Sequence, residues 1–227
     1  MGLLWRGIPD HLRSWSREFL GPEAVAIETG TFQGRSAKIL AKNFTYVHTI
    51  EQDAALARNA EKALVTFKNI SVKFGPSKDI LPECLPDGSV PCLFWLDAHF
   101  SGGQTSAVGN PCPVLDELQV VLTNRKADNT IILVDDIRGM LGANGWPRLD
   151  ELIAPAANHG YVAVISDDVL VLAAEQAVAY LSERHSSSRS AILEPLGGRL
   201  ELIIPLLQVL GVVMRTIYRI RHSRSGK

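Results

Sequence analysis

The chain has few cysteines, and they are not spaced as in a zinc site or a disulfide framework. Cys84, Cys92 and Cys112 form no C-x-x-C pair, and their number is odd. Small disulfide-stabilised domains and structural zinc sites both depend on paired cysteines. The composition therefore argues against either class and favours a reducing, cytoplasmic location.

An excess of charge of either sign is also absent. In 227 residues, 23 Lys and Arg are balanced by 24 Asp and Glu, which gives a formal net charge of −1. A global sum can hide a local basic patch, but nothing in this balance indicates nucleic acid as a partner. We therefore predict a protein that does not act on nucleic acid.

The N-terminal region lacks the long apolar core of a secretory signal. Charged residues interrupt it repeatedly between Arg6 and Arg17. We therefore expect no signal peptide, and we expect residues 9–19 to form an amphipathic helix that packs on the domain.

Near the end of the chain, an apolar run is too short to span a bilayer. Residues 201–214 are almost all apolar, whereas roughly 20 such residues are needed to cross a membrane. A basic segment follows the run, so residues 200–227 are consistent with peripheral binding to anionic lipid. The alternative is a helix that packs on the domain or on a second subunit, as in a homodimer. The serine-rich residues 186–190 predict a boundary between a domain at 1–185 and a C-terminal segment at 186–227.

Short apolar segments alternate with amphipathic ones along most of the chain. Strands are predicted at 24–27, 46–50, 70–74, 92–96, 130–134, 161–165 and 169–173. Helices are predicted between them, at 34–42, 53–66, 77–84, 113–125 and 147–158. This alternation predicts an α/β fold of Rossmann-like type, with a mostly parallel seven-stranded sheet and helices on both faces. The last two strands, joined by Ser166-Asp167-Asp168, predict a C-terminal antiparallel β-hairpin.

The first strand ends in a glycine-containing loop of the form E-x-G-x-x-x-G, from Glu28 to Gly34. Glycines allow a sharp turn close to a ligand, and the amides of the following helix can bind a carboxylate. Glu51 ends the second strand about twenty residues later, where a carboxylate can accept hydrogen bonds from ribose hydroxyls. The alternative is that the glycines only form a turn and Glu51 caps the next helix. The pyrophosphate loop G-x-G-x-x-G is absent, which argues against a dinucleotide.

Through residues 28–36 and 75–81 the chain resembles the class I S-adenosylmethionine-dependent methyltransferases, and within them the catechol O-methyltransferase-like group. The resemblance covers roughly residues 23–175, and the predicted hairpin fits it. It implies S-adenosylmethionine as the cofactor. The implied cofactor-binding residues are Glu28, Gly30, Thr31, Phe32, Gly34, Ser36, Glu51, Gln52, Ser77, Lys78 and Asp97.

Carboxylates follow two apolar strands that should end at the same sheet edge, Asp97 after one and Asp135 and Asp136 after the other. Carboxylates gathered at one edge repel each other unless a cation lies between them, and oxygen ligands suit Mg²⁺ or another divalent cation. Metal-dependent members of the resembled group carry acids at these places, and an acidic pair is similar to the macrolide-sugar O-methyltransferases. Alternatively, Asp97 contacts only the cofactor, and Asp135 or Asp136 caps a turn.

His99, two residues after Asp97, is the candidate base that takes the proton from a hydroxyl acceptor. The resembled catechol enzymes have a lysine shortly after the acid, whereas this chain has Phe100, so the role of His99 depends on its own surroundings. A packing role is the alternative. Asp97 and His99 are the predicted catalytic residues.

These observations predict an S-adenosylmethionine-dependent O-methyltransferase, assisted by a divalent metal, which acts on a hydroxyl of a small molecule or a sugar-containing metabolite. One alternative is a metal-independent methyltransferase, including one that acts on nitrogen. Another is a membrane-associated adaptor that keeps the fold without the chemistry.

Overall fold

The computed structural model describes residues 7–97 and 112–183, and residues up to Tyr180 belong to one compact unit. The predicted linker and apolar tail at 186–227 lie outside the described residues, as does His99. What the sequence predicts for them, including membrane contact and a homodimer, stays a prediction.

Seven strands form one sheet in the order β3-β2-β1-β4-β5-β7-β6. Only β7 runs antiparallel to its neighbours, β5 and β6, and the other pairs are parallel. This confirms the predicted mostly parallel sheet with a C-terminal antiparallel hairpin. The strands are β1 Val25–Thr29, β2 Val47–Glu51, β3 Ile70–Phe74, β4 Cys92–Leu96, β5 Thr130–Val134, β6 Val162–Ser166 and β7 Val169–Ala173.

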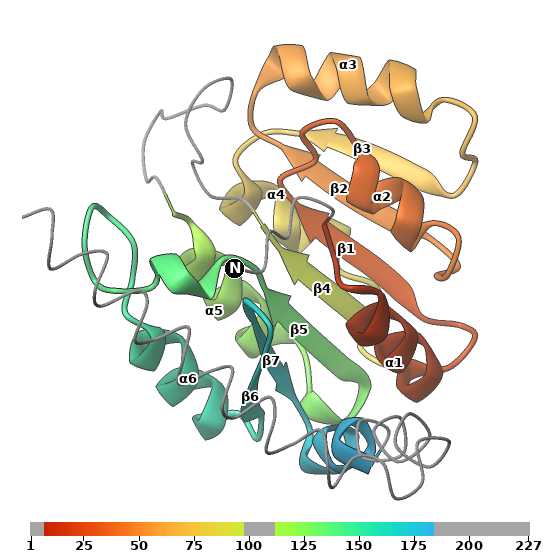
Figure 1. The fold of residues 1–227 in the computed structure, drawn as a ribbon. Helices are drawn as coiled ribbons and strands as arrows, with labels where there is room; N and C mark the ends of the chain where they lie inside the picture. The colour runs from red at the N-terminus through yellow and green to blue at the C-terminus, as the bar shows by residue number, and fades with distance from the viewer. Residues whose placement is uncertain (1–6, 98–111, 184–227) are drawn as a thin grey trace, which may run out of the picture. The chain divides into compact units, whose positions relative to one another are not determined.

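Helices lie on both faces of the sheet, with α1, α2 and α3 on one face and α4, α5 and α6 on the other (Figure 1). The helices are α1 Asp10–Leu20, α2 Arg35–Leu40, α3 Ala54–Leu64, α4 Ser77–Cys84, α5 Val114–Asn124 and α6 Leu149–Asn158. Two short 3₁₀ helices, η1 Ala127–Asn129 and η2 Ile137–Gly139, flank β5. Each helix in the parallel part carries the chain back across a face of the sheet before the next strand begins. The carboxyl ends of the parallel strands therefore lie at the same edge.

Two predicted boundaries were wrong near the site. The first strand extends to Thr29 rather than to residue 27, so Glu28 belongs to the sheet instead of following it. Helix α2 begins after Gly34, because Gly34 has a φ of 67°, which no residue of a right-handed helix adopts. Both differences place the turn between Gly30 and Gly34.

The central strands β4 and β5 are buried along their whole length. Their apolar side chains alternate between the two helical layers, and Phe94 and Ile132 belong to the core beneath α4, α5 and α6. Continuous apolar strands of this kind are typical of a parallel sheet covered on both faces. The three cysteines are buried, and no disulfide joins them. Among the helices of the described ranges, none is both long and apolar enough to cross a membrane.

Trp15 fixes α1 on the domain. It is fully buried, and its indole N–H donates to the Ala177 carbonyl at 3.0 Å. We expect Trp15→Ala to lower the free energy of unfolding by about 3–5 kcal/mol, because a large cavity forms and a buried carbonyl loses its donor. Urea denaturation measures this. Val65→Ala, at a position 77% exposed, is the control and should change stability by less than about 0.5 kcal/mol.

Candidate functional site

The carboxyl ends of β1, β2, β4 and β5 meet at one edge of the sheet. The Gly30 N–H donates to the Ile50 carbonyl at 2.9 Å, which fastens the turn after β1 to the end of β2. The Asp97 N–H donates to the Thr29 carbonyl at 3.2 Å, and the Asp135 N–H donates to the Leu96 carbonyl at 3.1 Å. The topology therefore brings the glycine loop, predicted to bind the cofactor, close to the acids that follow β4 and β5.

The loop after β1 turns through three residues with positive φ: Gly30 at 84°, Phe32 at 46° and Gly34 at 67°. A Cβ on Gly34 would lie 2.9 Å from Leu64 Cδ1, so the packing of α3 also requires glycine there. The left-handed conformation of Phe32 strains its backbone, because residues other than glycine rarely adopt it. The side chain of Phe32 is 41% exposed. An exposed aromatic ring in a strained loop suits a wall of a binding site better than a core position.

Glu51 connects this loop to the end of β2. Its carboxylate accepts from the Phe32 N–H at 2.8 Å and from the Asp53 N–H at 2.9 Å. The N-cap of α3 is Asp53, whose side chain accepts from the Ala55 and Leu56 amides, so Glu51 is not the helix cap. The carboxylate of Glu51 therefore lies beside the glycine loop, and its predicted role in binding ribose stays a prediction.

Glu28 lies inside the sheet rather than at its surface. Its carboxyl oxygen accepts from Thr49 Oγ1 at 2.6 Å, and Thr49 lies 2.6 Å from Thr31 Oγ1. Burial raises the pKa of Glu28 to about 7, and hydrogen bonds from Thr49 and Ser36 oppose that shift. Glu28 therefore connects two other predicted cofactor residues, Ser36 directly and Thr31 through Thr49. Its sequence position alone does not indicate this role.

The segment after β3 reaches the same edge, because the Gly75 N–H donates to the Glu51 carbonyl at 3.0 Å. Ser77 is buried at the first turn of α4, whereas Lys78 and Gln52 are exposed. Of these three predicted cofactor residues, only Ser77 has a side chain enclosed by the fold.

Glu117 on α5 is a buried acid that the sequence analysis missed. It is 1% exposed, and its Oε2 accepts from Thr29 Oγ1 at 3.2 Å. Thr29 Oγ1 also accepts from the Asp97 N–H at 3.2 Å. Burial raises the pKa of Glu117 to about 7, against hydrogen bonds from Ser77 and Thr29. Glu117 thus lies beneath the point where β1, β4 and α4 meet. The sequence signal for it was an acid on the otherwise apolar face of an amphipathic helix.

The three predicted metal ligands have different surroundings at this edge of the sheet. Burial and the neighbouring carboxylates of Asp135, Glu28 and Asp136 raise the pKa of Asp97 well above its usual value. Asp135 is buried and accepts from the Asp136 N–H at 2.8 Å. Within residues 7–97 and 112–183, no three His, Cys, Asp or Glu side chains lie close enough to hold a metal ion.

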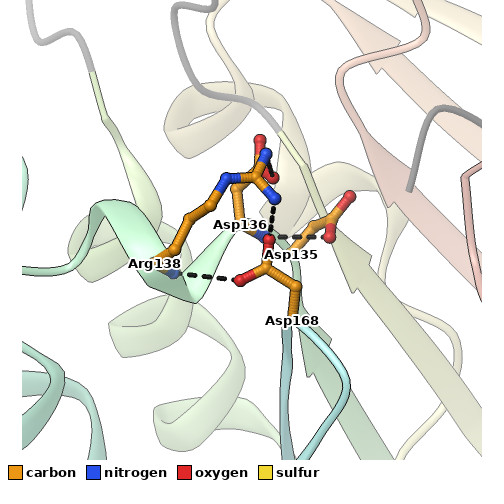
Figure 2. A network of polar contacts seen from close by, with 4 residues as sticks. All are labelled: Asp135, Asp136, Arg138 and Asp168. Carbon is orange, nitrogen blue, oxygen red and sulfur yellow. Dashed lines mark hydrogen bonds and ion pairs between the residues drawn. The ribbon is translucent and has the colours of Figure 1, made fainter. Parts of the chain in front are cut away.

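Asp136 is paired with Arg138, which also pairs with Asp168 in the hairpin turn (Figure 2). Sequence reasoning missed both Arg138 and Asp168, since about thirty residues separate them and neither lies in a motif. Arg138 thus places a cationic side chain beside one of the three predicted metal ligands.

Searches for related proteins found structural matches only. No family model and no curated protein matches the chain. An O-methyltransferase from Bacillus cereus, solved in complex with SAH, matches with a TM-score of 0.52 and 14% identity over 75% of this chain and 83% of that one. At that identity the match shows the fold alone, and it confirms the predicted Rossmann-like architecture.

Two other solved structures match with TM-scores below 0.5. TomG from Streptomyces achromogenes, an O-methyltransferase involved in tomaymycin synthesis, has a TM-score of 0.47 and 17% identity, over 72% of this chain and 78% of that one. The Podospora anserina methyltransferase PaMTH1 has a TM-score of 0.49 and 16% identity, over 74% of this chain and 89% of that one.

The raised pKa of Glu117 makes stability depend on pH. The unfolded chain releases this proton near pH 4.5, whereas the folded chain keeps it to about pH 7. The stability contributed by this group is therefore fully present below about pH 4.5 and is lost as the pH rises to about 7. Glu117→Gln cannot ionise, so from about pH 5 to about pH 7.5 the wild type should lose roughly 2–3 kcal/mol more than the variant.

Urea denaturation at both pH values measures that difference. Asp116→Asn, at the exposed neighbouring position, removes the same charge and should follow the wild type. Equal pH dependence in wild type and Glu117→Gln would contradict the assignment of a buried, protonated Glu117.

Proposed function

We propose that the protein is an S-adenosylmethionine-dependent methyltransferase that acts on a hydroxyl of a small molecule or a sugar-containing metabolite. The observation that carries the proposal is the position of the Glu51 carboxylate, which accepts from the Phe32 N–H of the glycine loop at 2.8 Å. Ligands of open α/β sheets bind beyond the carboxyl ends of the strands, where this loop lies. The fold shared with an O-methyltransferase solved in complex with SAH supports the same cofactor class.

The chain's own residues suit the parts of this cofactor. Glu51 would accept from the ribose hydroxyls, Ser77 and Lys78 would border the adenine, and the amides from Gly30 to Ser36 would face the methionine end. The positive φ of Gly30 supports a close approach of backbone to ligand. The missing pyrophosphate loop supports S-adenosylmethionine over a dinucleotide, because S-adenosylmethionine carries no phosphate.

When bound, S-adenosylmethionine supplies a methyl group activated by its sulfonium. The protein must hold the acceptor oxygen in line with that methyl and remove a proton. Asp97 is the described residue that would take this proton, since its carboxyl lies at the edge between β1 and β5. His99, the candidate base predicted from the sequence, lies outside the described residues.

The divalent-metal part of the hypothesis fits the structure less well. Asp97 and Asp135 would serve as oxygen ligands, but the third acid, Asp136, is paired with Arg138. We therefore assign no step to a metal. The same ion pair favours a second candidate, a metal-independent methyltransferase, for which an amine is an alternative acceptor.

The first test of the proposed function is whether Glu51 contributes to S-adenosylmethionine binding. Glu51→Gln should weaken S-adenosylmethionine binding by roughly 10–100-fold, because a charge-assisted hydrogen bond to the ribose becomes a neutral one. Titration calorimetry on the purified full chain measures the dissociation constant, and circular dichroism verifies the fold of each variant.

Glu61→Gln removes the same charge from an exposed position on α3 and should bind like the wild type. A folded wild type that binds no S-adenosylmethionine would contradict the proposed function and favour the non-catalytic adaptor.

A further inference from the structure

The side chain of Arg138 lies between two carboxylates from distant parts of the chain. It pairs with Asp136, directly after β5, and with Asp168, in the turn between β6 and β7. Figure 2 shows the guanidinium between these two side chains, whereas Asp135 points away from it. Arg138 is therefore a counter-ion that the chain itself supplies at the acidic edge of the sheet.

The backbone around Arg138 supports this position. The Arg138 N–H donates to Asp168 Oδ1 at 3.1 Å, and the Ile137 N–H donates to the Asp168 carbonyl at 3.2 Å. A Cβ on Gly139 would lie 2.7 Å from the Trp146 ring, so Trp146 packs directly on η2. Hydrogen bonds and packing thus hold η2 against the hairpin, in addition to the ion pairs.

The conformation of Asp136 separates it from Asp135. Asp136 has a φ of 54°, in the left-handed region that aspartate tolerates better than most residues. Its N–H binds Asp135 Oδ1 at 2.8 Å, and its carboxylate pairs with Arg138. The two neighbouring acids therefore do different things: Asp135 accepts from the backbone, and Asp136 binds the guanidinium.

A divalent cation at this edge would need the oxygens of Asp136 that Arg138 already binds. An arginine fork binds a carboxylate through directed hydrogen bonds and does not lose its charge. A metal would therefore have to displace Arg138 from Asp136 before it gained that ligand. With Asp136 paired, Asp97 and Asp135 are the acids left to a cation at this edge, and it would have to take its other oxygens from water.

We infer that Arg138 takes the place of a divalent cation at this edge, so that cofactor binding needs no metal and Asp136 is available to a metal only when Arg138 is removed. The part that concerns the cofactor rests on the proposed function. The part that concerns ion competition depends only on the contacts of Arg138.

Binding of Mn²⁺ to the metal-stripped full chain tests the competition, with the free-ion signal in electron paramagnetic resonance as the readout. Arg138→Gln should bind Mn²⁺ at least about tenfold more tightly than the wild type, because the guanidinium no longer competes. Adding Asp136→Asn to Arg138→Gln should abolish the gain. Arg148→Gln is the matched control, because the Arg148 side chain also pairs with an aspartate, Asp150, and is 66% exposed, compared with 61% for Arg138. This variant should bind Mn²⁺ like the wild type.

Several results would overturn the inference. One is a wild type that binds Mn²⁺ as tightly as Arg138→Gln; another is a double variant that keeps the gain. If Arg138→Gln fails to fold, the wild type alone still decides. Calorimetry compares its S-adenosylmethionine binding in the presence of Mg²⁺ with binding in the presence of a chelator. Tighter binding with Mg²⁺ overturns the inference, and equal binding supports it. A wild type that binds no S-adenosylmethionine removes the proposed function but leaves the Mn²⁺ comparison intact, so the two failures are distinguishable.

Discussion

Carboxyl groups buried at one edge of a parallel sheet are the constraint on which the rest of this structure depends. A buried acid is stable only when it is protonated, hydrogen-bonded or paired with a cation, and the chain uses all three solutions. Glu28 and Glu117 have raised pKa values and accept from threonine hydroxyls. Asp135 accepts from a backbone amide, and Asp136 pairs with Arg138. These requirements determine which loops meet at the edge and how they are held.

The same contacts hold the loops at this edge of the sheet in place. Glu51 holds the glycine loop through the Phe32 N–H, so the strained Phe32 is fixed by a charged acceptor rather than left to fluctuate. Thr29 connects Asp97 to Glu117, which ties the end of β4 to the inner face of α5. Under the proposed function, this rigidity would help to hold a cofactor and an acceptor in line, as a displacement reaction requires.

Arg138 changes how the acidic edge compares with the metal-dependent enzymes that the sequence resembles. Three acids after β4 and β5 are consistent with a metal, yet the charge that balances Asp136 comes from the chain itself. Since Asp168 in the hairpin binds the same guanidinium, the antiparallel end of the sheet also takes part in the electrostatics of the site. A fold therefore does not determine how its active edge is neutralised, and site chemistry has to be derived from individual contacts.

The sequence by itself determined the order of strands and helices, because apolar runs and turn residues are local signals. It also determined that Glu28, Glu51, Asp97 and Asp135 collect at one edge, since parallel strands all end there. Tertiary structure alone decided what each acid does. Arg138 and Asp168 are about thirty residues apart, and Glu117 reaches Thr29 across 88 residues, so no local pattern reveals these pairs. How deeply each carboxyl is buried, and which group it contacts, depends on packing between distant segments. Burial and contacts in turn set the charge of the carboxyl and the cation with which it pairs.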